Sequence, residues 1–389
     1  MDIRQVYFKM TKYIPFNKPW FSEFEKDYIL EALKDGHLSG DGKFTFQSSE
    51  YLKQYLNIEE VLITHSCTAA LEMSALIFNL KPGDEVILPS YTFVSTANAF
   101  VLRGATPVFI DIDKKTLNID VNKIEAAITS KTKIIVPVHY AGISCDMDIL
   151  MKIAKDNKLW VVEDAAQAFG SKYKNKFLGS IGELGTLSFH ATKNIISGEG
   201  GALLLNKKEL ISKAEIIREK GTNRKSFLNK KVDKYTWESL GSSYLPSEIL
   251  TAFLLGQLKN SSYIKSQRMN IWKSYFQGTE DLERKGYLTR PYIPNYCEHN
   301  AHMFYIILRE DICRNRVIDE LKEEGISVVF HYIPLHTSPA GLKYGKYIEN
   351  LINTDNLSRR ILRLPMWVGL STSDIERIID ILGKTLKNF

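Results

Sequence analysis

Cysteine is scarce in this sequence, and its spacing excludes the usual metal and disulfide patterns. The chain of 389 residues has four cysteines, at positions 67, 145, 297 and 313. They show neither CxxC spacing nor the density of a disulfide scaffold, so we expect a protein of the reducing cytoplasm. The eight histidines form no HExxH pair. The sequence therefore predicts no metal site.

Long apolar runs are also missing. No stretch approaches the roughly 18 apolar residues that a membrane-spanning helix requires. Residues 1–10 lack the uninterrupted apolar core of a signal peptide. We therefore expect neither a secretory leader nor a membrane partner.

Neither sign of charge dominates. Lys and Arg number 51 against 45 Asp and Glu, and the basic residues are scattered along the chain. This mild excess suits an anionic small molecule and disfavours nucleic acid as a partner. Hydrophobic residues at 44% and charged residues at 25% are typical of a globular protein, and the length is enough for two domains.

The common nucleotide-binding and hydrolase motifs are absent too. No GxGxxG opens a helix after a strand, and there is no Walker loop and no GxSxG elbow. The one glycine cluster, residues 198–201, precedes an apolar run. A nicotinamide site is therefore disfavoured.

The sequence does contain a regular alternation of strand and helix patterns. A capping box at Ser22 and Glu25 predicts a helix that ends near Gly36. Short apolar runs then predict strands at 61–64, 85–88, 107–110, 134–138, 160–162 and 201–206. Helices are expected between the first five, beginning near residues 68, 94, 122 and 146. This order predicts an α/β fold with a mainly parallel sheet covered on both faces.

The second half of the chain has a different pattern. It reads as helical from about residue 206 to residue 284. A strand at 304–308, a helix at 316–324, a strand at 327–331 and a helix at 373–386 follow. These elements predict a small C-terminal α+β domain. We expect a large domain at 13–255 and the small domain at 256–389.

Lys193 has unusual surroundings for a lysine. Apolar residues precede it, and small residues and glycines follow it. A lysine in a dry site has a lowered pKa, and its free amine can then attack a carbonyl. The alternative is an ordinary solvated surface lysine.

Several polar residues follow predicted strands, where parallel sheets bind ligands. The residues Ser66, Cys67 and Thr68 open a helix and form a phosphate seat, or Ser66 only caps that helix. Asp164 either pairs with a protonated ring nitrogen or caps a turn. Gln167 is close enough in sequence to reach the same ligand.

Two further strand ends complete the candidate site. Phe93 can stack on a planar ring or fill the core. Ser188 and His190 lie two residues apart on a predicted strand, so their side chains share one side. Together with Asp164 and Lys193 these residues follow the order expected for pyridoxal phosphate.

The chain resembles the DegT/DnrJ/EryC1/StrS sugar aminotransferases over nearly its whole length. The segments that carry this resemblance are residues 14–17, 39–42, 89–96 and 331–336. The resemblance implies an aspartate-aminotransferase-like fold (PLP fold type I) and the cofactor pyridoxal 5′-phosphate. It also implies a role for each candidate: Lys193 forms the Schiff base, Asp164 holds the pyridine nitrogen, Gln167 contacts the ring hydroxyl, Phe93 stacks on the ring, and Cys67, Thr68 and Ser188 bind the phosphate.

The family resemblance implies a homodimer with shared active sites. Many members have an asparagine that reaches the partner's phosphate, in the pattern Gly-x-Asn-Tyr-Arg. This chain has Ser243 at that position, and whether the serine replaces the contact is open. His331, Tyr332 and His336 either border the sugar and its diphosphate or have structural roles.

Residues 221–224, 233–237, 241–245 and 300–305 most resemble members that make dTDP-4-amino-4,6-dideoxy-D-galactose. The expected reaction moves an amino group from L-glutamate to the 4-keto group of dTDP-4-keto-6-deoxy-D-glucose. The product would serve lipopolysaccharide or enterobacterial common antigen synthesis. The gluco epimer and a 3-amino sugar stay open as products. The alternatives to amino transfer are a sugar 3-dehydratase, which Lys193 disfavours because those enzymes have histidine there, and a non-catalytic nucleotide-sugar-binding protein.

Overall fold

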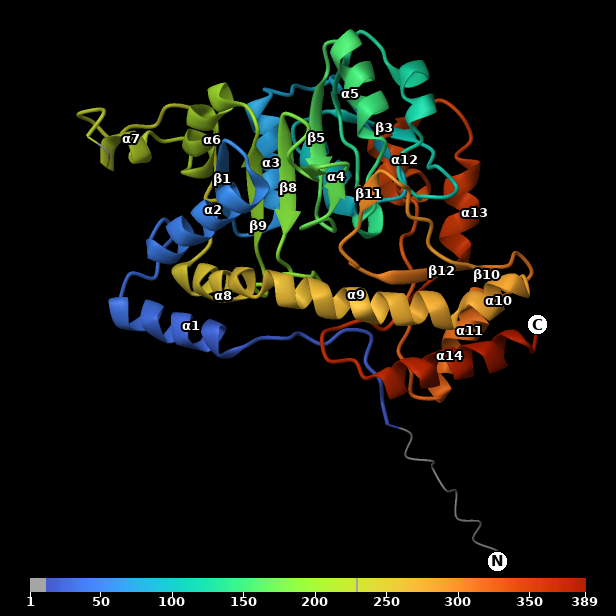
Figure 1. The fold of residues 1–389 in the computed structure, drawn as a ribbon. Helices are drawn as coiled ribbons and strands as arrows, with labels where there is room; N and C mark the ends of the chain where they lie inside the picture. The colour runs from blue at the N-terminus through green and yellow to red at the C-terminus, as the bar shows by residue number, and fades with distance from the viewer. Residues whose placement is uncertain (1–11, 229) are drawn as a thin grey trace, which may run out of the picture.

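The computed structural model describes residues 12–228 and 230–389. The prediction made for the first ten residues lies outside this range. Within the described residues, no helix combines the length and the apolar character needed to cross a membrane. Figure 1 shows a sheet with helices around it, and a rod formed by α8 (Glu248–Lys259) and α9 (Ser261–Gly278) runs below the sheet.

The main sheet has eight strands in the order β1-β9-β8-β5-β4-β2-β3-β13. From β8 to β13 all neighbours are parallel, and only β9 runs antiparallel to both β1 and β8. The strand bounds are β1 Glu60–Thr64, β2 Glu85–Pro89, β3 Thr106–Ile110, β4 Thr132–Ile135, β5 Trp160–Asp164, β8 Leu184–Ser188, β9 Gly201–Leu205 and β13 Lys346–Tyr347. The predicted mainly parallel sheet is confirmed.

Helices cover both faces of this sheet because successive strand residues point to opposite sides. In β1, Val61 and Ile63 join one buried cluster, and Leu62 joins the other. The first cluster includes residues of α2 (Lys43–Leu56), α5 (Met147–Asp156) and α8, and the second includes residues of α3 (Cys67–Ile77), α4 (Val94–Val101) and α6 (Ile211–Arg218).

A second sheet lies in the C-terminal part, with strand order β10-β12-β14. Its strands are β10 Leu288–Thr289, β12 Phe304–Leu308 and β14 Ile361–Leu364, and its helices include α10 Glu280–Arg284, α11 Arg314–Glu323 and α14 Thr372–Leu386. Phe304, Leu321 and Ile378 pack together in one cluster with residues of α9. The predicted α+β character of this part is confirmed.

The short elements complete the chain. A small sheet joins β6 Lys172–Tyr173, β7 Lys176–Phe177 and β11 Cys297–Glu298, and the remaining helices are α1 Glu23–Asp35, α7 Arg224–Leu228, α12 Pro339–Tyr344 and α13 Ile352–Arg360. The predicted capping box is present, since Ser22 Oγ accepts from the Phe24 N–H and the Ser22 N–H donates to Glu25. Gly36 ends α1 with a φ of 74°.

Three local predictions are wrong. The helix expected near residue 122 is two 3-10 turns, Val121–Lys123 and Glu125–Ala127, because Ile128 is already extended and the segment is too short to nucleate an α-helix. The strand expected at 327–331 is reduced to single bridges from Ile326 and Val329. Residues 330 and 331 are not part of any strand.

The helical pattern from 206 to 284 is also interrupted. Between Leu228 and Glu248 the described residues form no helix, and isolated bridges pair Thr222 with Trp237 and Glu219 with Ser243. This stretch contains Gly241, two neighbouring serines and Pro246, which are poor helix formers. The stretch and α7 project at the left of Figure 1.

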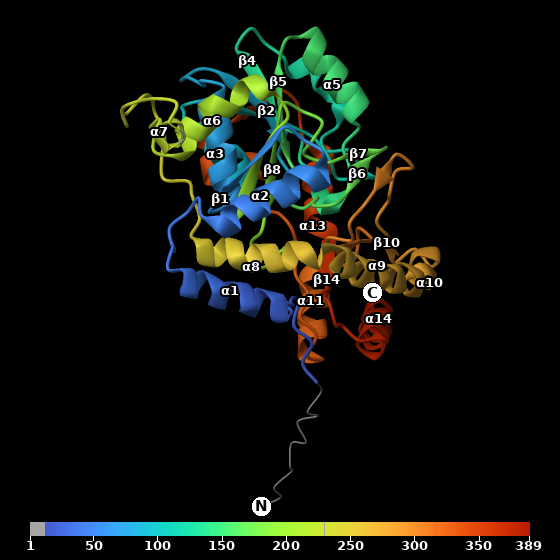
Figure 2. The ribbon, with the colours of Figure 1, turned by 60° about the vertical axis from the view of Figure 1, so that its left-hand side comes forward.

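Two segments cross between the parts of the fold. Ile14 packs in the C-terminal cluster, and β13 adds to the edge of the main sheet beside β3. The view in Figure 2 shows α8 between α1 and the main sheet, and α9 extending to α14. The predicted domain boundary at residue 255 falls inside α8, and it stays a prediction.

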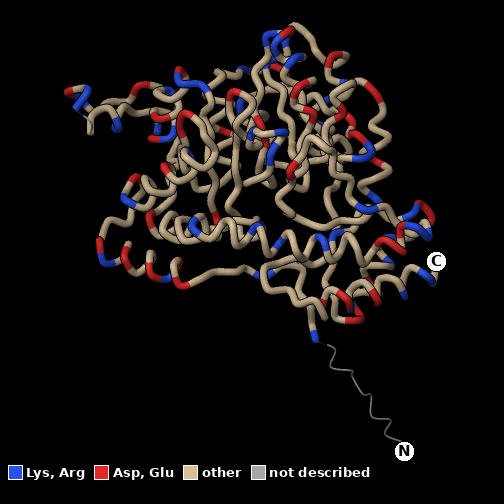
Figure 3. Tube along the Cα trace, viewed as in Figure 1, with Lys and Arg blue, Asp and Glu red and all other residues tan. Residues whose placement is uncertain are grey.

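Charges of both signs are interspersed along most elements (Figure 3). A few carboxylates are buried and stabilise the structure around them. Glu248, at the start of α8, accepts hydrogen bonds from the Gly42, Phe44 and Thr45 N–H groups at 3.0, 2.7 and 3.2 Å. It therefore satisfies the free N–H groups at the start of α2 and ties α2 to α8.

We predict that Glu248→Gln lowers the free energy of unfolding by roughly 1.5–3 kcal/mol, because charge-assisted hydrogen bonds to three N–H groups are weakened. Urea unfolding followed by circular dichroism measures the change. The matched control is Glu376→Gln, at an exposed position of α14. Equal stability of the two variants would contradict the role given to Glu248.

Candidate active site

One large cavity lies where the carboxyl ends of the parallel strands meet the C-terminal part of the chain. Its volume is about 630 Å³, which is in the range of small-molecule sites. Nine of the predicted site residues line it: Cys67, Thr68, Phe93, Asp164, Gln167, Ser188, Lys193, His331 and Tyr332. The sequence prediction thus named residues from five separate stretches of the chain that the fold brings together.

The start of α3 forms one wall of the cavity. Ser66 caps the helix, since its Oγ accepts from the Ala69 N–H at 3.1 Å. The N–H groups of Cys67 and Thr68 come first in the helix and have no acceptor within it. Thr68 Oγ1 donates to Ser95 Oγ at 2.8 Å, which holds the first turn against α4. Free N–H groups and hydroxyls at a helix start suit a phosphate.

Cys67 does not add negative charge to this wall. Burial, together with the carboxylate of Asp164, raises the pKa of the Cys67 thiol to about 12. The side chain is therefore a neutral thiol at neutral pH. A neutral thiol is compatible with a dianionic phosphate, which a thiolate would repel.

Asp164 is held in place at the end of β5. Its Oδ2 accepts from Thr96 Oγ1 at 2.7 Å, and its Oδ1 accepts from the Ala166 N–H at 3.1 Å. Gln167 is fixed as well, because its Oε1 accepts from the Ala141 N–H at 2.6 Å and its Nε2 donates to the Tyr332 hydroxyl at 2.9 Å. Both side chains therefore face the cavity in defined orientations.

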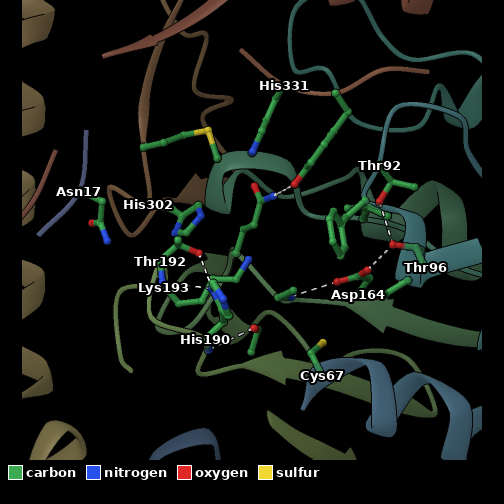
Figure 4. Close-up of a pocket in the computed structure, with 18 of the residues that line it drawn as sticks. Asn17, Cys67, Thr92, Thr96, Asp164, His190, Thr192, Lys193, His302 and His331 are labelled. Carbon is green, nitrogen blue, oxygen red and sulfur yellow. Dashed lines mark hydrogen bonds between the residues drawn. The ribbon is translucent and has the colours of Figure 1, made fainter. Parts of the chain in front are cut away.

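Lys193 lies in the loop between β8 and β9. The loop is closed by the Ala191 N–H donating to Gly198 O at 2.8 Å and the Lys193 N–H donating to His190 O at 2.9 Å. Burial lowers the pKa of Lys193, and the carboxylate of Asp164 only partly opposes this. Figure 4 shows the lysine near the centre of the cavity, between Asp164 and His302. The predicted depressed pKa of this lysine agrees with its surroundings.

His331 and Tyr332 form the opposite wall. Their rings are stacked, with centroids 3.9 Å apart and an angle of 13°. The Tyr91 hydroxyl donates to His331 O at 2.6 Å, and His331 Nδ1 lies 3.3 Å from the Tyr140 hydroxyl. Phe93 begins α4 at the cavity, and its ring centroid is 6.2 Å from that of Tyr332. An aromatic wall of this kind suits a planar ring or a sugar.

Two predicted residues lie elsewhere. His336 is buried outside the cavity lining, with Nδ1 2.7 Å from Ser90 Oγ and Nε2 3.4 Å from Asp355. This placement favours the structural alternative for His336. Ser243 is exposed and does not line the cavity of its own chain. Its expected contact is with a partner subunit, so that contact stays a prediction.

The sequence prediction missed three polar lining residues from the C-terminal part, namely Arg268, His302 and Arg363. Arg268 and His302 come from a helix and a loop whose patterns carry no functional signal. Arg363 did have one, because it interrupts the apolar strand formed with Ile361, Leu362 and Leu364. A charge in a buried strand requires a partner.

The residues present fit pyridoxal phosphate. A carboxylate held at Asp164 faces the same cavity as an amine with a lowered pKa, and the start of α3 offers a phosphate seat. These are the groups needed for the ring nitrogen, the aldehyde and the phosphate of that cofactor. The fold and the site together define a fold type I enzyme dependent on pyridoxal phosphate.

Comparisons with known proteins agree. The model of the DegT/DnrJ/EryC1/StrS aminotransferase family matches residues 20–383. Spore coat polysaccharide biosynthesis protein SpsC of Bacillus subtilis is 34% identical, covering 97% of this chain and 98% of that protein. GDP-perosamine synthase of Caulobacter vibrioides is 32% identical, with coverages of 93% and 95%. The PLP form of Spr1654 from Streptococcus pneumoniae superposes with a TM-score of 0.88 at 26% identity, covering 97% and 99%.

The chain therefore belongs to the DegT/DnrJ/EryC1/StrS aminotransferase family. The family and the fold class expected from the sequence are confirmed, and the protein is a sugar aminotransferase dependent on pyridoxal phosphate.

We predict that Gly201→Ala weakens the affinity for pyridoxal phosphate about tenfold or more. A Cβ on Gly201 would lie 2.4 Å from the Cys67 nitrogen, so the start of α3 must shift, and displaced charge-assisted hydrogen bonds cost affinity on this scale. Titration of the apoprotein, followed by visible absorbance, measures the dissociation constant.

The control for this substitution is Gly383→Ala in α14. A Cβ at position 383 meets only Leu282 Cδ2, at an ordinary 3.4 Å. We expect this control to bind the cofactor as the natural protein does. A Gly201→Ala variant with full affinity would show that the start of α3 is not the phosphate seat.

Proposed function

We propose that the protein transfers the amino group of L-glutamate to the 4-keto group of dTDP-4-keto-6-deoxy-D-glucose. The product is dTDP-4-amino-4,6-dideoxy-D-galactose, a precursor for cell-surface polysaccharide. The observation that supports this proposal most is the shared cavity of Lys193, Asp164 and the start of α3. The particular sugar rests on the sequence segments that resemble the transaminases making this product.

The relatives support a nucleotide sugar as the acceptor. One is named for spore coat polysaccharide biosynthesis, and another is named for GDP-perosamine. The two names refer to different products and different biological settings. They therefore do not identify the nucleotide of the substrate or the epimer of the product, and experiment must decide both. The cavity of about 630 Å³ has room for a hexose beside the cofactor.

Each residue then has a defined task. Pyridoxal phosphate, when bound, supplies an aldehyde that captures amines and a ring that accepts electrons from the adjacent carbon. Lys193 holds the cofactor covalently. Once the donor has freed it, the Lys193 amine removes the proton from the donor's α-carbon and later delivers a proton to C4 of the sugar. A lowered pKa suits this task because the amine is more often unprotonated.

The remaining residues bind and orient the cofactor and the sugar. The Asp164 carboxylate keeps the ring nitrogen protonated, and the hydrogen bond from Thr96 keeps the carboxylate directed at that nitrogen. Gln167 would contact the ring hydroxyl, and Phe93 would stack on the ring. Cys67, Thr68 and Ser188 bind the phosphate. His331 and Tyr332 border the sugar and exclude water on that side.

We propose a homodimer in which Ser243 faces the partner's phosphate seat. The mouth of the cavity and the stretch that contains Ser243 expose large apolar side chains, with Phe93 56%, Val94 56% and Trp237 76% accessible. Apolar surface of this kind supports burial against a second chain. The cytoplasm stays the predicted location, supported by four cysteines that are all free.

The direct test is to incubate the cofactor-loaded protein with L-glutamate and dTDP-4-keto-6-deoxy-D-glucose. We predict a single amino sugar whose proton couplings in NMR place the new C4 amine axially, as in the galacto epimer. An equatorial amine or an amine at C3 would show that the sugar was assigned wrongly.

Lys193→Ala serves as the matched control in the same assay. It removes only the amine that holds the cofactor, so we expect a folded protein with no amino transfer and no visible absorbance of a lysine-bound cofactor. Retained turnover in this variant would overturn the role of Lys193. Inactivity of the natural protein with every keto sugar tested would favour the non-catalytic alternative.

A further inference from the structure

Arg363 is the one arginine of the cavity whose charge has no partner in the described part of the chain. It lies in β14, where Ile361, Leu362 and Leu364 are buried, and its side chain lines the cavity. The guanidinium makes no ion pair and no hydrogen bond with the described residues, and its Nε is buried without a partner. The Phe16 ring lies against the guanidinium, with its centroid 4.7 Å from the Arg363 Cζ.

The other cavity arginine shows the contrast. Arg268 donates from Nε to Ala301 O at 3.1 Å and from its terminal nitrogens to His302 O at 2.5 Å and Met366 O at 3.4 Å. Arg268 is therefore a structural cation that holds three carbonyl groups. Arg363 has no such contacts, although burial lowers its pKa and thus penalises its charge. A buried charge of this kind costs free energy until an anion pairs with it.

The residues around Arg363 do not supply this anion, so a ligand must supply it. The neighbouring His302 and His331 are neutral, because burial lowers the pKa of each well below the ordinary histidine value. The two acids that line the cavity are engaged elsewhere. Asp164 accepts hydrogen bonds from Thr96 and Ala166, and Glu199 lies 3.7 Å from His190.

The position relative to Lys193 identifies the kind of anion. The charge of Arg363 is close enough to lower the pKa of Lys193, and both side chains line one cavity. An amino acid donor carries its carboxylate on the carbon whose proton Lys193 removes. A nucleotide sugar carries its diphosphate on C1, across the hexose ring from the reacting C4. The anion nearest to the reacting atoms is therefore the donor's carboxylate.

We propose that Arg363 binds the α-carboxylate of the amino donor through two parallel N–H···O hydrogen bonds. The planar guanidinium matches a carboxylate in this geometry. The contact fixes the donor's α-carbon within reach of Lys193, which raises the rate by orientation. This inference rests on the proposed function, because it assigns a residue to the donor half of that reaction.

The test compares donor binding with nucleotide binding in the cofactor-loaded Arg363→Met variant. Titration calorimetry with glutarate, a dicarboxylate without an amino group, measures donor-site affinity apart from turnover. We expect glutarate to bind about 10- to 100-fold more weakly, the range for one lost charge-assisted bidentate contact. The concentration of L-glutamate giving half the maximal rate of the donor half-reaction should rise in parallel. Binding of thymidine diphosphate should be unchanged.

Two further variants make the result specific. Arg316→Met removes an exposed arginine of α11 that pairs with Glu320 at 2.8 Å, and it should bind glutarate normally. Arg363→Lys keeps the charge and loses the planar fork, so its affinity should lie between those of Arg363→Met and the natural protein. Circular dichroism verifies that each variant is folded.

The outcomes separate this inference from the proposed function. If the natural protein uses L-glutamate but Arg363→Met and Arg363→Lys bind glutarate normally, the role of Arg363 is wrong and the function stands. If the loss falls on thymidine diphosphate, Arg363 serves the nucleotide, and the inference is again overturned. If the natural protein does not react with L-glutamate in the presence of any keto sugar, the proposed function itself fails.

Discussion

The pairing of two neighbouring strands fixes the chemistry of this protein. β5 and β8 are parallel, with Asp164 in register with Thr186, so both strands end at the same edge of the sheet. The carboxylate of Asp164 therefore lies at that edge beside the loop that holds Lys193. Parallel neighbouring strands have their carboxyl ends at the same edge of the sheet, so strand pairing alone brings the Asp164 carboxylate and the Lys193 amine into one cavity. The start of α3, at Cys67, lies at the same edge of the sheet, in the layer of helices that covers it.

The C-terminal part of the chain makes this edge a closed site. The loop of Lys193 is tied to it, because Asn194 Nδ2 donates to Asn300 O at 2.9 Å and Asn194 Oδ1 lies 2.9 Å from His302 Nδ1. Arg268 then holds the carbonyl groups on either side of this contact. Residues far away in sequence therefore exclude water from the Lys193 side chain. This dehydration lowers the pKa of Lys193 and makes its amine a nucleophile.

Local patterns in the sequence indicated which strand ends and loops line the cavity. The apolar run before Asp164 and the glycines after Lys193 made both residues candidates, and the family resemblance supplied the roles expected of them. The same patterns do not separate Asp164 from its neighbour Glu163, which points to the other face and accepts hydrogen bonds from three N–H groups near Gly179. No local pattern encodes contacts between distant segments. The position of Arg363 in the cavity and the pairing of β13 with β3 both depend on such contacts.

The chemistry proposed for this site requires a covalent bond between the amine of Lys193 and pyridoxal phosphate. Borohydride reduction of the cofactor-loaded protein, followed by peptide mapping, tests for this bond. We predict one stable pyridoxyl label, on the peptide that contains Lys193. A label on another lysine, or a protein that remains unlabelled and colourless with the cofactor present, would contradict it.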